Sequence, residues 1–294
     1  MAIDPIYQAM IRQVLLDSEI MVDAQMKVVY SAQKQALNSL NTSIGELFIT
    51  YSTNGLLLIN SVKKAKIIAE FKAKLKLMGK ELGQKEIDTV TDILANVFKD
   101  SYYKQAFIND IGIKMDLKFS MLKSEYIESA INQKLHGNMF STRIWKNKAS
   151  MINQLQASIV ECMKGKTSID KVGRQIRDTF NVTSYQSKRL VHTEAARVSS
   201  QASIDIAKNI GIKQHMWDST LDSKTSEFCQ LHDGKIYDVD DDSIGIPKSS
   251  HPKCRCCWCN ISYTGWTPTS KKDNISKEII PYQQYAEWAK SKGL

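Results

Sequence analysis

The chain has 294 residues, enough for two domains of ordinary size, and 43% of them are apolar, which excludes a disordered protein. Its net charge of +9, from 40 Lys and Arg against 31 Asp and Glu, is compatible with a polyanionic partner but does not require one. The first residues lack a basic start followed by an apolar run, and the longest aliphatic stretch, residues 56–59, is too short to cross a bilayer. We therefore expect a protein made in a cytoplasm, without a membrane segment.

The region before residue 140 is predicted to be largely helical, and it carries no recognised motif. Proline is absent between Pro5 and Pro247, and residues that favour helices are abundant. Apolar residues recur at steps of three and four over residues 68–82 and again over residues 87–97, as on one face of a helix. Breaks between helices are expected at Asn54-Gly55, at Gly83 and at residues 109–112.

Lysines are dense around the first of these apolar stripes. They are Lys63, Lys64, Lys66, Lys72, Lys74, Lys76 and Lys80. One interpretation is a polyanion-binding face, directed at DNA or at an acidic protein surface. The alternative, which we favour on general grounds, is the solvated side of a helix whose apolar stripe packs into a bundle.

Further helices are expected over residues 140–211. An apolar face begins near Phe140 and ends before Gly165, where the chain breaks. Ser168 can cap the next helix, which runs to about residue 180. Another helix is expected over residues 184–209, with Gly211 as its stop signal.

The character of the chain changes after this glycine. Short strands are expected over residues 213–218, 235–237 and 255–263, with Asp233-Gly234 as a turn. A unit this small, with little aliphatic core of its own, needs packing against neighbours or a metal to be stable.

The chain thus divides into three predicted regions. They are a helical region over residues 1–139, helices followed by a Cys/His-rich sheet unit over residues 140–265, and a polar tail over residues 266–294 with a short helix around residues 282–290. The expected fold class is α+β, a long and mostly helical N-terminal region followed by a small C-terminal β-containing domain that zinc would stabilise.

Five of the six cysteines fall within thirty-one residues near the C-terminus, together with two histidines. In a reducing compartment such clustering indicates metal binding more than disulfides. Two residues separate Cys229 from His232 and His251 from Cys254, which is the spacing of a metal knuckle. The preferred ligands are these four, with Cys256 able to replace one histidine. A filled tetrahedral Cys/His set predicts one structural zinc ion.

Two alternatives to zinc stay open. The residues can be buried reduced thiols and turn histidines of a packed sheet, or two of the cysteines can form a disulfide. If residues 254–259 are extended, Cys254 and Cys256 face one side, and Cys257 and Cys259 face the other.

A longer motif overlaps this cluster. Its residues are Trp217, Asp218, Asp222, Cys229, Asp233, Gly234, His251, Pro252, Cys254, Arg255 and Cys256, with Glu194 upstream on a predicted helix. Together they resemble the C-terminal signature of phage minor head proteins, the Mu F-like or SPP1-type head morphogenesis family. The resemblance covers roughly residues 140–262.

The resemblance implies a minor capsid protein rather than an enzyme. Family members attach to the portal protein inside the head, take part in procapsid assembly, and act in DNA packaging or ejection. The implied partners are the portal protein, scaffolding or major capsid protein, and double-stranded DNA, and the implied location is the virion. Some relatives are fused to toxin domains, but we expect none here because the tail after Trp266 is short.

Three features of the chain can be compared with the family pattern. His232 stands where the family commonly has Cys or His, which retains a metal ligand. His192 replaces an arginine of the helix motif, so no role is carried over to that position. Cys257 and Cys259 are additional to the usual ending.

Other functional interpretations are weaker. His192 and Glu194 could form an acid–base pair, but we expect Glu194 to pair with Arg189, Arg197 or a backbone donor. Asp218 and Asp222 are expected to cap backbone N–H groups.

We retain two alternatives. One is a metal-dependent nuclease with Glu227 or His251 as the base, and the other is a DNA-binding zinc module. The acidic stretch over residues 218–242 argues against the zinc module, because it would repel DNA.

Overall fold

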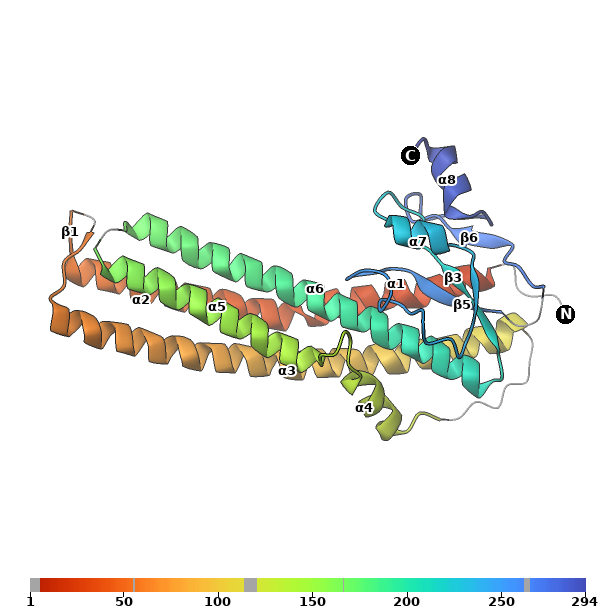
Figure 1. The fold of residues 1–294 in the computed structure, drawn as a ribbon, viewed down its shortest axis with the longest axis horizontal. Coiled ribbons are helices and arrows are strands. Elements are labelled where there is room, and N and C mark those ends of the chain that lie inside the picture. Colours follow the sequence, from red (N-terminus) through yellow and green to blue (C-terminus); the bar gives the residue numbers. More distant parts are fainter. Residues whose placement is uncertain (1–5, 55, 114–120, 166, 262–264) are drawn as a thin grey trace. The chain divides into compact units, whose positions relative to one another are not determined.

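A computed structural model describes residues 6–54, 56–113, 121–165, 167–261 and 265–294 (Figure 1). The chain divides into two compact units. The mixed unit contains Met1–Ala24, Asp92–His136 and Val191–Leu294, and the helical unit contains Gln25–Thr91 and Gly137–Leu190. Gly55 of the expected break at Asn54-Gly55, and the last residues of the strand expected over 255–263, lie outside the described residues.

The helical unit is built from long helices whose apolar faces form one core. Leu40, Leu75, Leu155 and Ile176 in this core are at most 1% exposed. Its elements are α2 (Lys27–Tyr51), the short strands β1 (Ser52–Thr53) and β2 (Leu56–Leu57), the first part of α3 (Ser61–Ile113), α5 (Phe140–Met163) and the first part of α6 (Ile169–Asn209). The core follows from the periodic apolar residues of the sequence, because each helix buries its apolar stripe.

A buried polar layer crosses this core. Lys148 and Glu86, whose side chains are 2% and 1% exposed, form an ion pair at 2.5 Å. The Ser187 hydroxyl donates to Glu86 at 3.0 Å, and Gln33 donates to Ser187 at 3.1 Å. The layer therefore supplies partners for a charge pair that would otherwise be costly to bury.

The helix break expected at Gly83 does not exist, because α3 continues through it. A Cβ atom added at Gly83 would lie 2.3 Å from the Trp145 ring of α5, and one added at Gly79 would lie 2.7 Å from Ile152. These glycines therefore admit side chains from α5, which explains their place inside a helix.

Two further expectations of breaks were wrong. Residues 109–112 lie within α3, where the Asn109 amide donates to the Gln105 carbonyl at 2.7 Å. The helices expected to end near residue 180 and to begin near residue 184 are one helix, α6. The Thr183 hydroxyl donates to the Thr179 carbonyl at 2.8 Å, so this polar side chain bonds within the helix.

The mixed unit combines helices with short strands. Besides the remaining parts of α3 and α6, its elements are α1 (Tyr7–Gln25), α4 (Ser124–Asn132), β3 (Gln214–Asp218), α7 (Glu227–His232), β4 (Ile236–Asp238), β5 (Cys257–Ile261), β6 (Ser270–Lys272), β7 (Ile279–Pro281) and α8 (Tyr285–Lys292). The α+β class predicted from the sequence is confirmed.

The central sheet has the order β4-β3-β5, and both pairings are antiparallel. Trp217 lies opposite Trp258 in its register, and Asp218 lies opposite Cys257. Gly234 begins the return to β4 with φ +78°, a conformation that favours glycine, and this agrees with the predicted turn.

The C-terminal residues form more than a polar tail. Strands β6 and β7 pair as an antiparallel hairpin, and α8 corresponds to the expected short helix. Trp288 on α8 is fully buried, and Lys271 on β6 is only 2% exposed. Among the described residues, no helix is long and apolar enough to cross a membrane.

The role of Gly83 gives a first prediction. Gly83→Ala is expected to lower the free energy of unfolding by about 1–2 kcal/mol, because the Trp145 ring has to move. The matched control is Gly45→Ala on α2, where an added Cβ atom meets nothing within 4 Å. There a gain of about 0.5–1 kcal/mol is expected from helix propensity. Urea unfolding measures both, and equal effects of the two substitutions would contradict the packing argument.

Candidate functional site

Three of the predicted metal ligands come together in the mixed unit. Cys229 lies on α7, and its sulfur is 3.8 Å from that of Cys254 in the segment before β5. Ligand atoms of Cys229, His251 and Cys254 all lie within 4.8 Å of one another. Sulfur ligands about 2.3 Å from a tetrahedral zinc ion are separated by about 3.8 Å, so the sulfur pair fits such an ion. These three residues can therefore hold a metal ion.

Cys256 is a further buried sulfur donor of this region, although it is not one of the three residues whose ligand atoms lie within 4.8 Å of one another. It is 3% exposed and belongs to the same buried cluster as Cys229, Cys254 and the two tryptophans Trp217 and Trp258. Hydrogen bonding with Cys229 lowers the pKa of Cys254 well below its usual value, and the contact with Cys254 raises the pKa of Cys229.

The neighbouring cysteines face the other way. Cys257 and Cys259 on β5 pack with a different cluster, which includes Tyr7 and Met216. This agrees with the alternation expected for an extended segment. Burial raises the pKa of both thiols well above the usual value.

The structure does not bring His232 into the metal-ligand cluster. Its ring stacks on Phe228 with 4.0 Å between ring centroids, and its Nδ1 lies 2.7 Å from the Phe228 carbonyl oxygen. Residues Glu227–His232 form the helix α7, capped by Ser226, whose hydroxyl accepts from the Cys229 N–H. The Cys-x-x-His spacing therefore belongs to a helical turn here and not to a metal knuckle.

Two motif aspartates form a buried charge cluster beside this site. Asp218 lies 2.6 Å from Arg12 of α1 and 3.2 Å from Lys271 of β6. Lys271 also lies 2.6 Å from Asp233. The side chains of all four residues are 5% exposed or less.

The two carboxylates of the cluster differ in acidity. Burial alone would raise the pKa of Asp218, but Arg12 and Lys271 hold it below its usual value. Burial raises the pKa of Asp233, the nearby Asp218 carboxylate adds to this effect, and Lys271 offsets only part of it. Asp233 also accepts from the Ser219 N–H at 2.8 Å and from the Tyr285 N–H at 2.6 Å. It therefore links α8 to the end of β3.

The remaining motif residues have structural partners. Asp222 pairs with Arg255 at 2.5 Å and accepts from the Lys224 N–H at 2.9 Å, as expected of a capping turn residue. Trp217 is fully buried at the centre of the sheet. Pro252 follows His251, and its carbonyl oxygen lies 3.0 Å from His251 Nδ1.

His192 and Glu194 each pair with a different residue of opposite charge. Glu194 is fully buried and pairs with Arg197 at 2.7 Å, one of the partners expected for it. Arg197 in turn donates to the Ala130 carbonyl oxygen at 2.7 Å. His192 lies 3.0 Å from Asp23 of α1.

The predicted polyanion-binding lysines lie on α3, far along the sequence from the metal ligands. Six of them are exposed, and Lys64 is half-buried. Lys63 lies over the Tyr51 ring, 4.7 Å from its centroid. Their spacing distributes them around the outer side of the helix and not along one narrow stripe.

Arg12 and Lys271 were not predicted from the sequence as members of the site. Arg12 lies in a region without a motif, and Lys271 lies after the end of the motif, next to a second lysine, Lys272. A periodic pattern could not have found them, because only the tertiary fold brings them to the aspartates.

The fold and the site define a small Cys/His-containing sheet module that packs on long helices. Residues 153–259, which include most of this module, match the family model described as Phage Mu protein F like protein. This match confirms the predicted resemblance to the phage minor head protein family.

Three known proteins are similar to the chain. Minor head protein GP7 of Bacillus phage SPP1 is 22% identical over 87% of this chain and 89% of its own length. An NAD(+)–arginine ADP-ribosyltransferase, EFV, of Enterococcus faecalis V583 is 26% identical over 94% of this chain. The chain spans 55% of the length of that protein. An uncharacterized protein of Haemophilus influenzae Rd is 22% identical over 50% of this chain. No solved structure matches the chain significantly.

The charge cluster gives a second prediction. Lys271→Met is expected to lower the free energy of unfolding of the mixed unit by about 3–5 kcal/mol, because it leaves Asp233 buried without its cation. Lys272→Met is the matched control, since Lys272 is only partly buried and bonds a neutral partner, Gln13. Its cost should stay below about 1 kcal/mol. Tryptophan fluorescence during urea unfolding compares them, and equal small losses would contradict the role of the cluster.

Proposed function

We propose that this chain is a minor head protein of a tailed phage or prophage. It binds the portal protein inside the head and takes part in procapsid assembly and in DNA packaging or ejection. The observation that carries this proposal is the similarity to the SPP1 minor head protein, which extends over 87% of this chain and 89% of that protein. Further partners in this role are scaffolding or major capsid protein. The role is structural, without turnover.

The distribution of charge supports an additional contact with double-stranded DNA. The helical unit has 20 Lys and Arg against 8 Asp and Glu, a net charge of +12, whereas the mixed unit has 20 against 23, a net charge of −3. The net positive charge of the chain thus belongs to the helical unit, and the mixed unit, which contains the Cys/His module, is slightly negative. DNA contact through the helical unit would weaken steeply as the salt concentration rises. The mixed unit lacks the net positive charge that a DNA-binding zinc module would need.

We further propose that Cys229, His251, Cys254 and Cys256 hold one zinc ion with a structural role. Three or four protein sulfur and nitrogen donors at tetrahedral spacing are typical of such sites. If Cys256 completes the set, all four positions are filled by protein and none is open for a reacting water, which would argue against the nuclease alternative. His251 would then be a ligand and not a base.

Zinc content gives a third prediction. The purified chain is expected to contain one zinc ion, and Cys256→Ser and His251→Ala are expected to lose most of it. Cys257→Ser and His232→Ala are the matched controls, because Cys257 faces the other side of β5 and His232 stacks on Phe228. They should retain the metal. Mass spectrometry measures the zinc content of each purified protein. A zinc-free chain with a folded mixed unit would contradict the zinc proposal.

Co-purification tests the head-protein proposal itself. The chain and the portal protein encoded by the same phage are expected to co-elute in size-exclusion chromatography at moderate salt. Separate elution of the two folded proteins would reject portal binding and bring DNA binding and the nuclease alternative forward. DNA cleavage with added zinc or magnesium that His251→Ala abolishes would favour the nuclease.

A further inference from the structure

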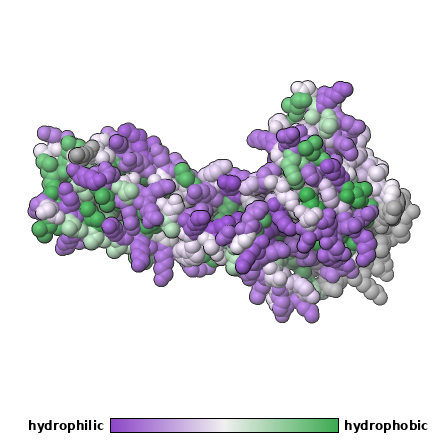
Figure 2. All heavy atoms as spheres, in the orientation of Figure 1, coloured by the Kyte–Doolittle hydropathy of each residue, from purple (hydrophilic) through white to green (hydrophobic). Residues whose placement is uncertain are grey.

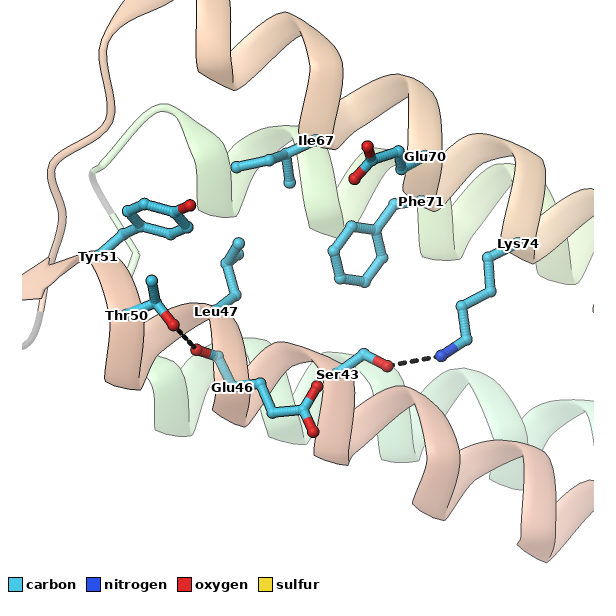
Figure 3. Close-up of a pocket in the computed structure, with 9 residues that line it drawn as sticks. All are labelled: Ser43, Glu46, Leu47, Thr50, Tyr51, Ile67, Glu70, Phe71 and Lys74. Atoms are coloured by element: carbon cyan, nitrogen blue, oxygen red, sulfur yellow. Dashed lines mark hydrogen bonds between the residues drawn. The ribbon is translucent and has the colours of Figure 1, made fainter.

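A pocket of about 360 Å³ lies between α2 and α3 in the helical unit (Figure 3). Its floor is apolar, because Leu47, Ile67 and Phe71 line it and are each 9% exposed or less. Tyr51 stands at one end of it (Figure 3). Its volume lies within the range of ligand-binding clefts, roughly 300–1,000 Å³.

The charges at this pocket differ from those of the helices that form it. Residues 25–80 contain nine lysines and only two acidic residues, Glu46 and Glu70. Both acidic residues line the pocket, Glu46 from α2 and Glu70 from α3. Within the described part of the chain, neither carboxylate makes an ion pair. Lys74, the cation that also lines the pocket, donates to the Ser43 hydroxyl at 2.5 Å.

We propose that this pocket holds one long cationic side chain, Arg or Lys, from a segment of the portal protein. The aliphatic stem of such a side chain would lie on the apolar floor, and its charged end would reach the carboxylates at the mouth. Arginine suits the site best, because its planar guanidinium can bond carboxylates through several N–H groups. This inference rests on the proposed function, since it names the surface that the portal protein would contact.

The surrounding lysines restrict which segment can bind. Seven of the nine lie on α3, between Lys63 and Lys80, and would repel a segment with many positive charges. The segment that fits therefore carries a single cation flanked by acidic or neutral residues. Attraction and repulsion together would make the contact selective.

Apolar surface beside the pocket indicates a protein partner and not a small molecule. Ile49, Leu58 and Val62, in or next to the connection between α2 and α3, are 87%, 67% and 81% exposed. Figure 2 shows hydrophobic side chains gathered at the end of the helical unit where β1 lies. A bound metabolite would leave these side chains in water, whereas a protein segment anchored in the pocket can also cover them.

Binding of the portal protein to variants of the full chain tests the proposal. Glu46→Gln combined with Glu70→Gln removes both charges and keeps the shape of the side chains. It is expected to weaken binding at least about tenfold, since hydrogen bonds to charged groups are lost. Thr50→Trp places an indole at the mouth of the pocket and is expected to weaken binding to a similar degree. Thr50 is exposed and lines the pocket.

Exposed residues of the same helices outside the pocket provide matched controls. Glu81→Gln on α3 and Thr42→Trp on α2 should bind like the unaltered chain. Circular dichroism would show that each variant is folded. If the unaltered chain binds and the pocket variants bind equally well, or the controls lose as much, the pocket assignment is overturned and portal binding stands. If the unaltered chain does not bind, both proposals are overturned.

Discussion

The mixed unit depends on one buried arrangement of charge, in which Arg12 and Lys271 surround Asp218 and Asp233. The four residues come from α1, from β6, from the end of β3 and from the turn after α7. A buried charge that loses its partner costs several kcal/mol, so these segments have to assemble together. The N-terminal helix and the C-terminal hairpin are therefore parts of the same folded unit as the Cys/His residues.

The charge cluster and the thiol cluster lie on opposite sides of the same two strands. The Cys257 thiol donates to Asp218 at 3.4 Å, while the neighbouring residue Cys256 donates to the Ser219 hydroxyl at 3.7 Å. Adjacent residues of an extended chain point to opposite faces, so one short segment serves both clusters. A metal at the thiol cluster would fix the segment from one face, and the ion pairs fix it from the other.

Local patterns were enough to predict the fold class and to single out Cys229, His251 and Cys254, which the structure brings together. The strands, the Asp233-Gly234 turn and the alternation of the cysteines follow from short-range rules, and the structure agrees with them. Gly83 misled the prediction because its reason is a contact with Trp145 from another helix. His232 has the spacing of a ligand, but α7 turns its ring onto Phe228. Neither contact can be inferred from neighbouring residues in the sequence.

The boundaries predicted at residues 139/140 and 265/266 remain a prediction.

The proposed role of the chain is that of a head component held at the portal vertex. Mass spectrometry of purified heads from the phage or prophage that encodes the chain tests it most directly, with heads assembled without the portal protein as comparison. We expect the chain to be present in portal-containing heads and to be lost from heads without the portal protein. Equal amounts in both kinds of head, or absence from both, would contradict it.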